Sequence, residues 1–204
     1  MTDDCVEFSG TAEKTSYSLI DRLKTKDQEA WRHFVQLYGP LVYHWCCRFG
    51  LQDAEAADVG QEVFRTVSGS ITGFQLNHKG SSFRGWLRTV TRTRTIDFLR
   101  RKAKEPEAVG GSDARAMLHD LPAGFTEGTS SPEDEERILV RRVSDMVLEN
   151  CKAESRQAFL RVVVAGEHPS VVAADLGMTV NAVYLAKSHI LRRIREELFL
   201  LVNV

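Results

Sequence analysis

Arginines recur through the stretch FRGWLRTVTRTRTIDFLRR, residues 83–101. At about 100° per residue, Arg84, Arg88 and Arg92 fall on one stripe of a helix. Like charges four residues apart destabilise an isolated helix by roughly 0.2–0.5 kcal/mol per pair, whereas a phosphate backbone opposite them would reverse that cost. A merely solvated helix face usually carries both signs, and this stripe does not. The pattern therefore predicts a helix that binds nucleic acid through its phosphates.

The side of this helix opposite the arginines is predicted to face the core. Its apolar residues are Phe83, Trp86, Leu87 and Val90. Asp97, the single acid of the segment, falls on the core-facing side, three residues after Arg94 and four before Arg101, and is expected to form an ion pair that orients an arginine. Ile96 and Leu99 lie off the apolar stripe, so the helix is either kinked or contacted on a second side.

The formal net charge of the 204-residue chain is −1, but the charges are segregated. Residues 79–104 carry nine lysines and arginines against one acid, and residues 105–136 carry nine acids against one arginine. The two segments nearly cancel in the total. An almost neutral chain therefore still offers a strongly cationic surface to an anionic partner.

A second helix is predicted just upstream, over EAADVGQEVFRTV, residues 55–67. Valines at every fourth position give it a core-facing side: Val59, Val63 and Val67. Asp58, Gln61 and Glu62 are expected to be more exposed. An acidic helix face next to a basic one suggests two different partners, a basic protein surface and a nucleic acid.

The segment HPSVVAADLGMTVNAVYLAKSHILRRIREEL, residues 168–198, has the pattern of a helix-turn-helix. Pro169 starts a short helix, small Ala173 allows close approach, Gly177 supplies the positive φ of a tight turn, and Thr179 caps a second helix. The shared core is predicted to be Val172, Leu176, Val183, Ala186, Ile190 and Ile194. Outward-facing residues near the start of the second helix are placed to enter a major groove, and the basic residues that follow are suited to phosphates. An ordinary helical hairpin is the alternative.

Apolar residues recur at helical spacing and no convincing strand pattern is evident, so the fold class is predicted to be all-α. We expect two small helical domains joined by a flexible acidic linker, the second containing the helix-turn-helix. The boundaries are a disordered amino terminus at 1–15, a first domain at 16–104, a linker at 105–132 and a second domain at 133–204. Ser131, Pro132 and the acids that follow predict a helix start.

Several classes of function are disfavoured by what the sequence lacks. It has no GxxxxGK[ST] loop, HExxH site or GxSxG elbow, so we expect no enzyme and no cofactor. Its four cysteines form no CxxC pair, which predicts reduced thiols and no metal site. It lacks a secretory signal, and no apolar run approaches the roughly 20 residues of a membrane span. A cytoplasmic protein is expected.

Taken together, these segments resemble a bacterial RNA polymerase sigma factor of the extracytoplasmic-function (ECF) group, which carries two domains called two and four. DVGQEVF, residues 58–64, resembles the family's core-polymerase-binding signature. FRGWLRTVTRTRTIDFLRR resembles its promoter-melting and minus-ten segment, and the helix-turn-helix resembles its minus-thirty-five reader. The resemblance covers roughly residues 17–104 and 133–198, with the three motifs in the family's order and spacing.

The resemblance implies a transcription initiation factor that binds core RNA polymerase and promoter DNA and promotes promoter melting. Core polymerase would be contacted by Asp58, Gln61, Glu62 and Phe64. Minus-ten DNA would be contacted by Arg84, Arg88, Arg92, Thr93, Arg100 and Arg101. Minus-thirty-five DNA would be contacted by Thr179, Asn181, Tyr184, Leu185, Lys187, Ser188 and Arg192. An anti-sigma factor is an open third partner, because many family members are held inactive by one and no residue here decides the matter.

The sequence departs from the family pattern at four of these motif positions. Gly60 replaces a usual aliphatic residue, and Thr93 stands where asparagine is frequent, which leaves the preferred minus-ten base open. Tyr184 and Ala186 occupy positions where the family commonly has basic residues, which leaves the individual minus-thirty-five contacts open.

Two other functions are alternatives to that of a sigma factor. A helix-turn-helix repressor or activator would bind duplex DNA without polymerase, usually as a dimer on a palindrome. A small recombinase or nuclease with a DNA-reading tail would need a nucleophile or clustered carboxylates in the first domain. It is disfavoured because the candidates Glu55, Asp58 and Glu62 lie on one predicted helix without a partnering acidic motif.

Overall fold

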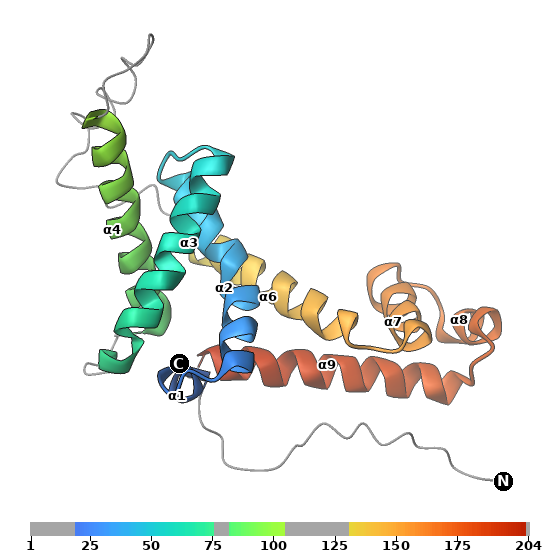
Figure 1. Cartoon of the computed structure of the whole chain (residues 1–204). Coiled ribbons are helices and arrows are strands. Elements are labelled where there is room, and N and C mark those ends of the chain that lie inside the picture. The colour runs from blue at the N-terminus through green and yellow to red at the C-terminus, as the bar shows by residue number, and fades with distance from the viewer. Residues whose placement is uncertain (1–18, 76–81, 105–130, 203–204) are drawn as a thin grey trace.

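The computed structural model describes residues 19–75, 82–104 and 131–202 (Figure 1). Within these ranges the regular elements are helical and no strand occurs, which confirms the predicted all-α class. The predicted disordered amino terminus, residues 1–15, and residues 105–130 of the predicted linker lie outside the described residues.

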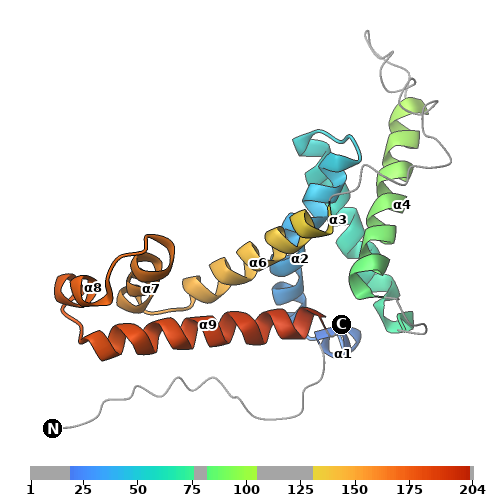
Figure 2. The same ribbon diagram turned by 180° about the vertical axis from the view of Figure 1, so that it is seen from behind.

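Two groups of helices follow each other along the chain. The first comprises α1 (Leu19–Lys24), α2 (Gln28–Arg48), α3 (Asp53–Ser70), a 3-10 turn (Ile71–Gly73) and α4 (Phe83–Lys104). The second comprises α6 (Pro132–Glu149), α7 (Ala153–Phe159), a π-helical turn (Leu160–Val164), α8 (Pro169–Leu176) and α9 (Val180–Val202). From opposite directions, α3 and α4 are seen on one side of α2, and α6 and α9 extend from the other (Figures 1 and 2).

Helix α2 is the centre of the core. Asp27 caps it, because its Oδ1 accepts the N–H groups of Glu29 and Ala30 at 2.9 and 3.1 Å. The ring of Phe34 meets those of Trp31, Phe64 and Phe83 edge to face, with centroids 5.5 to 5.6 Å apart. Burying each such ring contributes roughly 1.5–3 kcal/mol. The aromatic cluster thereby fixes α3 and α4 against α2.

Helix α4 runs unbroken and buries one residue in four: Phe83, Leu87, Thr91, Thr95 and Leu99. Four residues turn through about 400°, so this row drifts around the helix and contacts both α2 and α3. Of the two alternatives left by the sequence, contact on a second side is therefore the observed one. The Thr91 hydroxyl satisfies itself by donating to the Leu87 carbonyl at 2.9 Å.

The prediction that Asp97 faces the core is wrong. Its side chain is 43% exposed, and the threonines Thr91 and Thr95 occupy the buried row instead. A threonine that bonds its own helix backbone can enter a core at little cost, whereas a lone carboxylate cannot. The predicted ion pair does form, with Arg94 Nη1 3.5 Å from Asp97 Oδ2.

Helix α6 begins where the sequence predicts. The Ser131 hydroxyl accepts the N–H of Asp134 at 3.1 Å, and Pro132 is the first helical residue. Acids in the first turn then face the positive end of the helix dipole. The apolar row Leu139, Val143 and Val147 joins the core around α2.

The helix-turn-helix has a small core of its own, formed by Ala158, Val172, Ala173 and Val183. Gly177 adopts φ +64° and Thr179 Oγ1 accepts the N–H of Ala182 at 3.1 Å, as the sequence predicts. The inclusion of Ile190 and Ile194 in this core is wrong, because both belong to the larger cluster with α2 and α6. The two groups of helices therefore share one core, and the domain boundaries at 16–104 and 133–204 stay predictions.

Two glycines test the backbone argument. Gly177→Ala should lower the free energy of unfolding by about 1–2 kcal/mol, because an L side chain strains the left-handed conformation at the end of α8. Gly69→Ala, inside α3 with no atom within 4 Å of an added Cβ, should raise it by roughly 0.5–1 kcal/mol. Urea unfolding measures both, and equal effects of the two substitutions would contradict the argument.

Candidate nucleic-acid and protein interface

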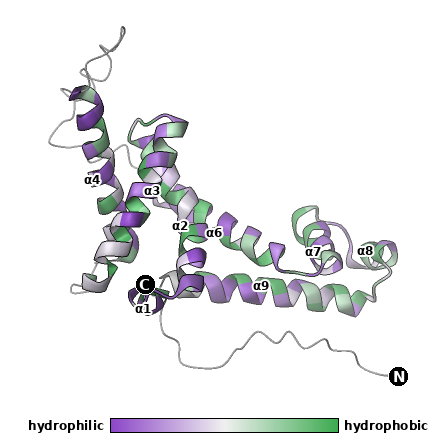
Figure 3. Ribbon diagram, viewed as in Figure 1, coloured by the Kyte–Doolittle hydropathy of each residue, from purple (hydrophilic) through white to green (hydrophobic). Residues whose placement is uncertain are grey.

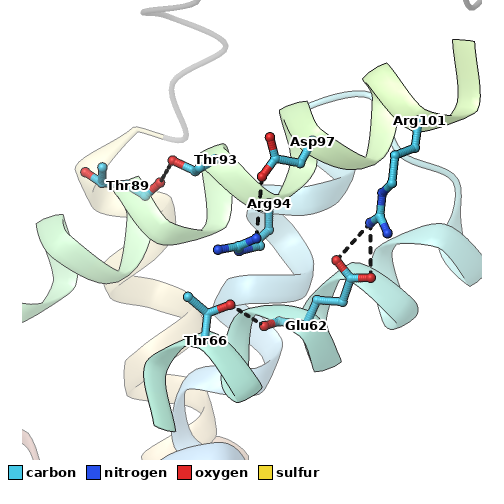
Figure 4. A network of polar contacts seen from close by, with 7 residues as sticks. All are labelled: Glu62, Thr66, Thr89, Thr93, Arg94, Asp97 and Arg101. Carbon is cyan, nitrogen blue, oxygen red and sulfur yellow. Dashed lines mark hydrogen bonds and ion pairs between the residues drawn. The ribbon is translucent and has the colours of Figure 1, made fainter. Parts of the chain in front are cut away.

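The basic face of α4, defined as Arg84, Arg88, Arg92, Thr93 and Arg100, lies away from the aromatic cluster. Arg84, Arg92, Thr93 and Arg100 are exposed, and Arg88 is half-buried. The Thr93 hydroxyl donates to the Thr89 carbonyl at 2.9 Å (Figure 4). Hydrophilic residues dominate the carboxyl-terminal end of α4 in Figure 3. The face is therefore accessible to an anion along most of the helix.

One carboxylate already approaches this face. Glu135 of α6 is buried, with its carboxylate oxygens 3.7 Å from Arg84 Nε and from Arg88 Nη1. The indole N–H of Trp45 in α2 donates to the same carboxylate at 2.8 Å. Neither Trp45 nor Glu135 was predicted as a site residue. The acid of Glu135 suggested only a helix start, since nothing local indicates that a residue 90 positions away will bond to it.

The acidic face of α3, defined as Glu55, Asp58, Gln61 and Glu62, lies beside the end of α4. Arg101 Nη2 donates to both oxygens of Glu62 at 3.1 and 3.0 Å (Figure 4). Lys102 Nζ lies 2.6 Å from Glu55 Oε1. Burial raises the pKa of Glu55, but hydrogen bonds from Lys102 and the Gln52 N–H outweigh it and the net pKa is lowered. The Glu55 carboxylate therefore stays ionised.

The predicted polymerase-contacting and minus-ten residues are thus adjacent. Asp58 and Gln61 are exposed and Glu62 is half-buried, while the Phe64 ring packs on Phe34. Arg101, assigned to DNA by resemblance, is the residue that bonds Glu62. Gly60 is buried in an unbroken α3, where an added Cβ would lie 4.0 Å from Val42. One surface hollow is lined by both helices, including Asp58, Gln61, Glu62 and Arg101.

The outward face of α9 carries the predicted minus-thirty-five residues. Tyr184 and Leu185 are half-exposed, at 50% and 53%. Thr179, Asn181, Ser188 and Arg192 are also exposed, and Lys187 is half-buried. Arg192 lies 3.9 Å from Glu196 one turn later. Side chains near the amino end of α9 are therefore free to meet a groove.

A charged clamp holds α8 in place, and the sequence did not reveal it. Arg161, in the π-helical turn, bonds both carboxylate oxygens of Glu167 and donates to Asp175 at 2.7 Å. The hydrogen bond from Arg161 lowers the pKa of Glu167. Bidentate guanidinium–carboxylate pairs fix orientation as well as distance. The clamp therefore sets the angle of α8 to α7.

The described residues contain neither a metal-binding cluster nor a single membrane-spanning helix. No group of three or more histidine, cysteine or acidic side chains is arranged to hold a metal ion there. In the same residues no single helix is long and apolar enough to cross a bilayer. Only α8 and α9 taken together have the length and composition of a span, and the two are bent by 106°. Burial raises the pKa of the Cys46 thiol to about 11.

Comparisons with known proteins place these features in a family. The sigma-70 region 2 model matches residues 34–105. The chain is 30% identical over 162 residues to the ferric citrate uptake sigma factor FecI of Escherichia coli (strain K12), covering 76% of this chain and 86% of FecI. It is 30% identical over 107 residues to the ECF RNA polymerase sigma factor SigW of Bacillus subtilis (strain 168), covering 51% of this chain and 56% of SigW.

Further relatives are more distant. The ECF RNA polymerase sigma factor SigE of Mycolicibacterium smegmatis (strain ATCC 700084 / mc(2)155) is 25% identical over 178 residues, covering 84% of this chain and 63% of SigE. The chain thus spans less than two thirds of SigW and of SigE. Among solved structures, the RsbN–BldN complex matches with a TM-score of 0.35 at 15% identity, covering 87% of this chain and 97% of that one. CnrH in complex with the cytosolic domain of CnrY matches with a TM-score of 0.36 at 18% identity, covering 88% of this chain and 94% of that one.

The identity to FecI extends over most of both chains and includes the segments with the acidic and basic faces. This protein therefore belongs to the ECF group of RNA polymerase sigma factors.

The Trp45–Glu135 bond predicts a measurable loss of stability. Trp45→Phe keeps the ring in the core but leaves the buried carboxylate without its closest donor, so the free energy of unfolding should fall by about 1–3 kcal/mol. Trp31→Phe removes the same N–H from a partly buried ring of the same helix and should cost less. Denaturant titration compares the two, and a Trp45→Phe effect no larger than that of Trp31→Phe would refute this role.

Proposed function

We propose that this protein is a transcription initiation factor that binds core RNA polymerase through the acidic face of α3. It binds promoter DNA through α4 and α9 and favours melting at the minus-ten element. The observation that carries the proposal is that the acidic face of α3 lies against the carboxyl-terminal end of the basic helix α4, through Arg101 on Glu62 and Lys102 on Glu55. A protein-binding surface and a DNA-binding surface that share these contacts can hold the polymerase and the melted strand side by side.

The acidic face of α3 and the basic face of α4 carry different chemical groups and therefore suit different partners. Asp58, Gln61 and Glu62 offer carboxylate and amide acceptors, which suit a basic protein surface. The arginines of α4 offer charge to phosphates, while the exposed Thr89 and Thr93 offer hydroxyls and the half-buried Trp86 offers a ring edge to unpaired bases. Capturing an unpaired base costs a few kcal/mol of stacking, which phosphate neutralisation offsets. The reaction chemistry belongs to the polymerase.

The helix-turn-helix supplies duplex recognition. Asn181 and Ser188 carry hydrogen-bonding groups suited to base edges, and Leu185 suits a thymine methyl. Arg192 and Lys187 suit phosphates. A cytoplasmic location and the lack of catalytic activity stay predictions from the sequence, and the existence of an anti-sigma partner stays open.

The polymerase contact is tested by abortive transcription from a promoter library with purified bacterial core polymerase. Wild type should give promoter-specific product, and replacing Asp58, Gln61 and Glu62 together by alanine should abolish it. A control variant with Glu133→Ala and Glu136→Ala also removes two negative charges, but from exposed positions of α6, and should retain product. No stimulation by wild type, together with tight duplex binding by the chain alone, would instead favour a polymerase-independent repressor or activator.

The phosphate role of α4 is tested by salt dependence. Arg92→Gln should weaken promoter binding by the polymerase-bound factor and reduce the slope of log K against log salt by about 1, because one phosphate contact is lost. Arg137→Gln, at a position on α6 that is 82% exposed, should leave the slope unchanged. Equal slopes for wild type and Arg92→Gln would remove Arg92 from the DNA-binding face.

A further inference from the structure

Glu135 occupies a site that is built for an anion. Three donors from two helices converge on its carboxylate, namely the Trp45 indole N–H, Arg84 and Arg88. The side chain of Glu135 is only 6% exposed, so the interaction is largely shielded from water. A buried carboxylate is tolerated only where such partners are present. The same donors would suit a phosphate oxygen equally well.

The contacts of Glu135 are unequal in strength. The Trp45 bond, at 2.8 Å, has the length of a charge-assisted hydrogen bond. The arginine atoms lie 3.7 Å away, which is an ion pair without a short hydrogen bond. The arginine side chains also remain 43% and 35% exposed. The arginines are therefore held loosely enough to exchange one anion for another.

Other contacts bring α6 and α9 to this position. Arg142 of α6 donates from Nε to the Gln36 carbonyl of α2 at 2.7 Å. His33 of α2 lies 3.4 Å from Glu197 of α9, and the hydrogen bond from His33 lowers the pKa of Glu197. The apolar row of α6 completes the contact with α2. Together they hold the second group of helices against the first, with Glu135 at the basic face.

We propose that Glu135 is an autoinhibitory contact. It is an internal ligand for the anion site of Trp45, Arg84 and Arg88, and nucleic-acid phosphate gains full access to this end of α4 only when α6 moves away. The inference rests on the proposed function, in which α4 binds promoter DNA. A competing internal anion lowers the apparent affinity of the free chain by the fraction of molecules in which the site is open.

The first test compares DNA binding by matched variants of the full chain. Glu135→Gln is isosteric and can still accept the Trp45 N–H, but it releases the arginines. Its affinity for a fluorescein-labelled single-stranded DNA of mixed sequence, measured by anisotropy, should rise on the order of tenfold. Glu136→Gln removes the same charge one residue later, at an exposed position, and should bind as wild type does. Thermal unfolding of each variant verifies that it is folded.

The second test distinguishes the effect of displacing α6 on DNA affinity from the effect of merely removing a negative charge. Arg142→Ala breaks a contact between α6 and α2 that lies away from the basic face. It removes a positive charge, which by itself should weaken DNA binding. If displacement of α6 exposes the site, Arg142→Ala should nevertheless bind DNA more tightly than wild type. Arg141→Ala, at an exposed position beside it, should show no gain.

The outcomes distinguish this inference from the proposed function. Equal affinities for wild type, Glu135→Gln and Glu136→Gln would overturn it. A gain in Glu135→Gln that Arg142→Ala does not share would overturn the movement of α6. If wild type gives promoter-specific product with core polymerase but the affinities are equal, only the inference fails. If no product forms while both gains appear, the proposed function fails and the autoinhibitory contact stands.

Discussion

The hydrogen bond between the Trp45 indole and the Glu135 carboxylate is the constraint on which the arrangement of the two groups of helices depends. Both residues are almost fully buried, so neither can return to water without separating α6 from α2. A buried carboxylate without partners would be strongly destabilising. The bond therefore fixes the register of α6 on α2, and through α6 it determines where α9 lies.

Charge balance within the fold follows from the same arrangement. The chain carries a cationic helix, and each of its ends is partly neutralised by a different element. Glu135 lies at Arg84 and Arg88, and the acids of α3 lie at Arg101 and Lys102. Arg92 and Arg100, near the middle and further along α4, are exposed. These two exposed arginines are therefore directly accessible to an approaching polyanion.

Sequence patterns predicted the features that arise within one helix or turn. The Ser131 and Thr179 caps, the positive φ of Gly177 and the valine row of α3 all depend on neighbours a few residues away. Features set by distant partners were missed or misplaced. Periodicity cannot show that Thr91 and Thr95 are buried in a core, or that Ile190 joins the larger cluster around α2 and not the small core of the helix-turn-helix. The role of Glu135 depends on Trp45, which lies 90 residues earlier.

Helix α9 joins two distant parts of the molecule in one continuous helix. Its first half carries Asn181 and Tyr184, and Glu197 near its other end bonds His33 of α2. At about 1.5 Å per residue, Asn181 and Glu197 lie roughly 24 Å apart along the axis. Between these two points α9 packs along α6 and α7. A tilt of about 10° about the Glu197 end would move Asn181 by roughly 4 Å, comparable to the rise of about 3.4 Å between successive base pairs. In the proposed function, such a tilt would change the spacing between the two DNA elements that α4 and α9 contact.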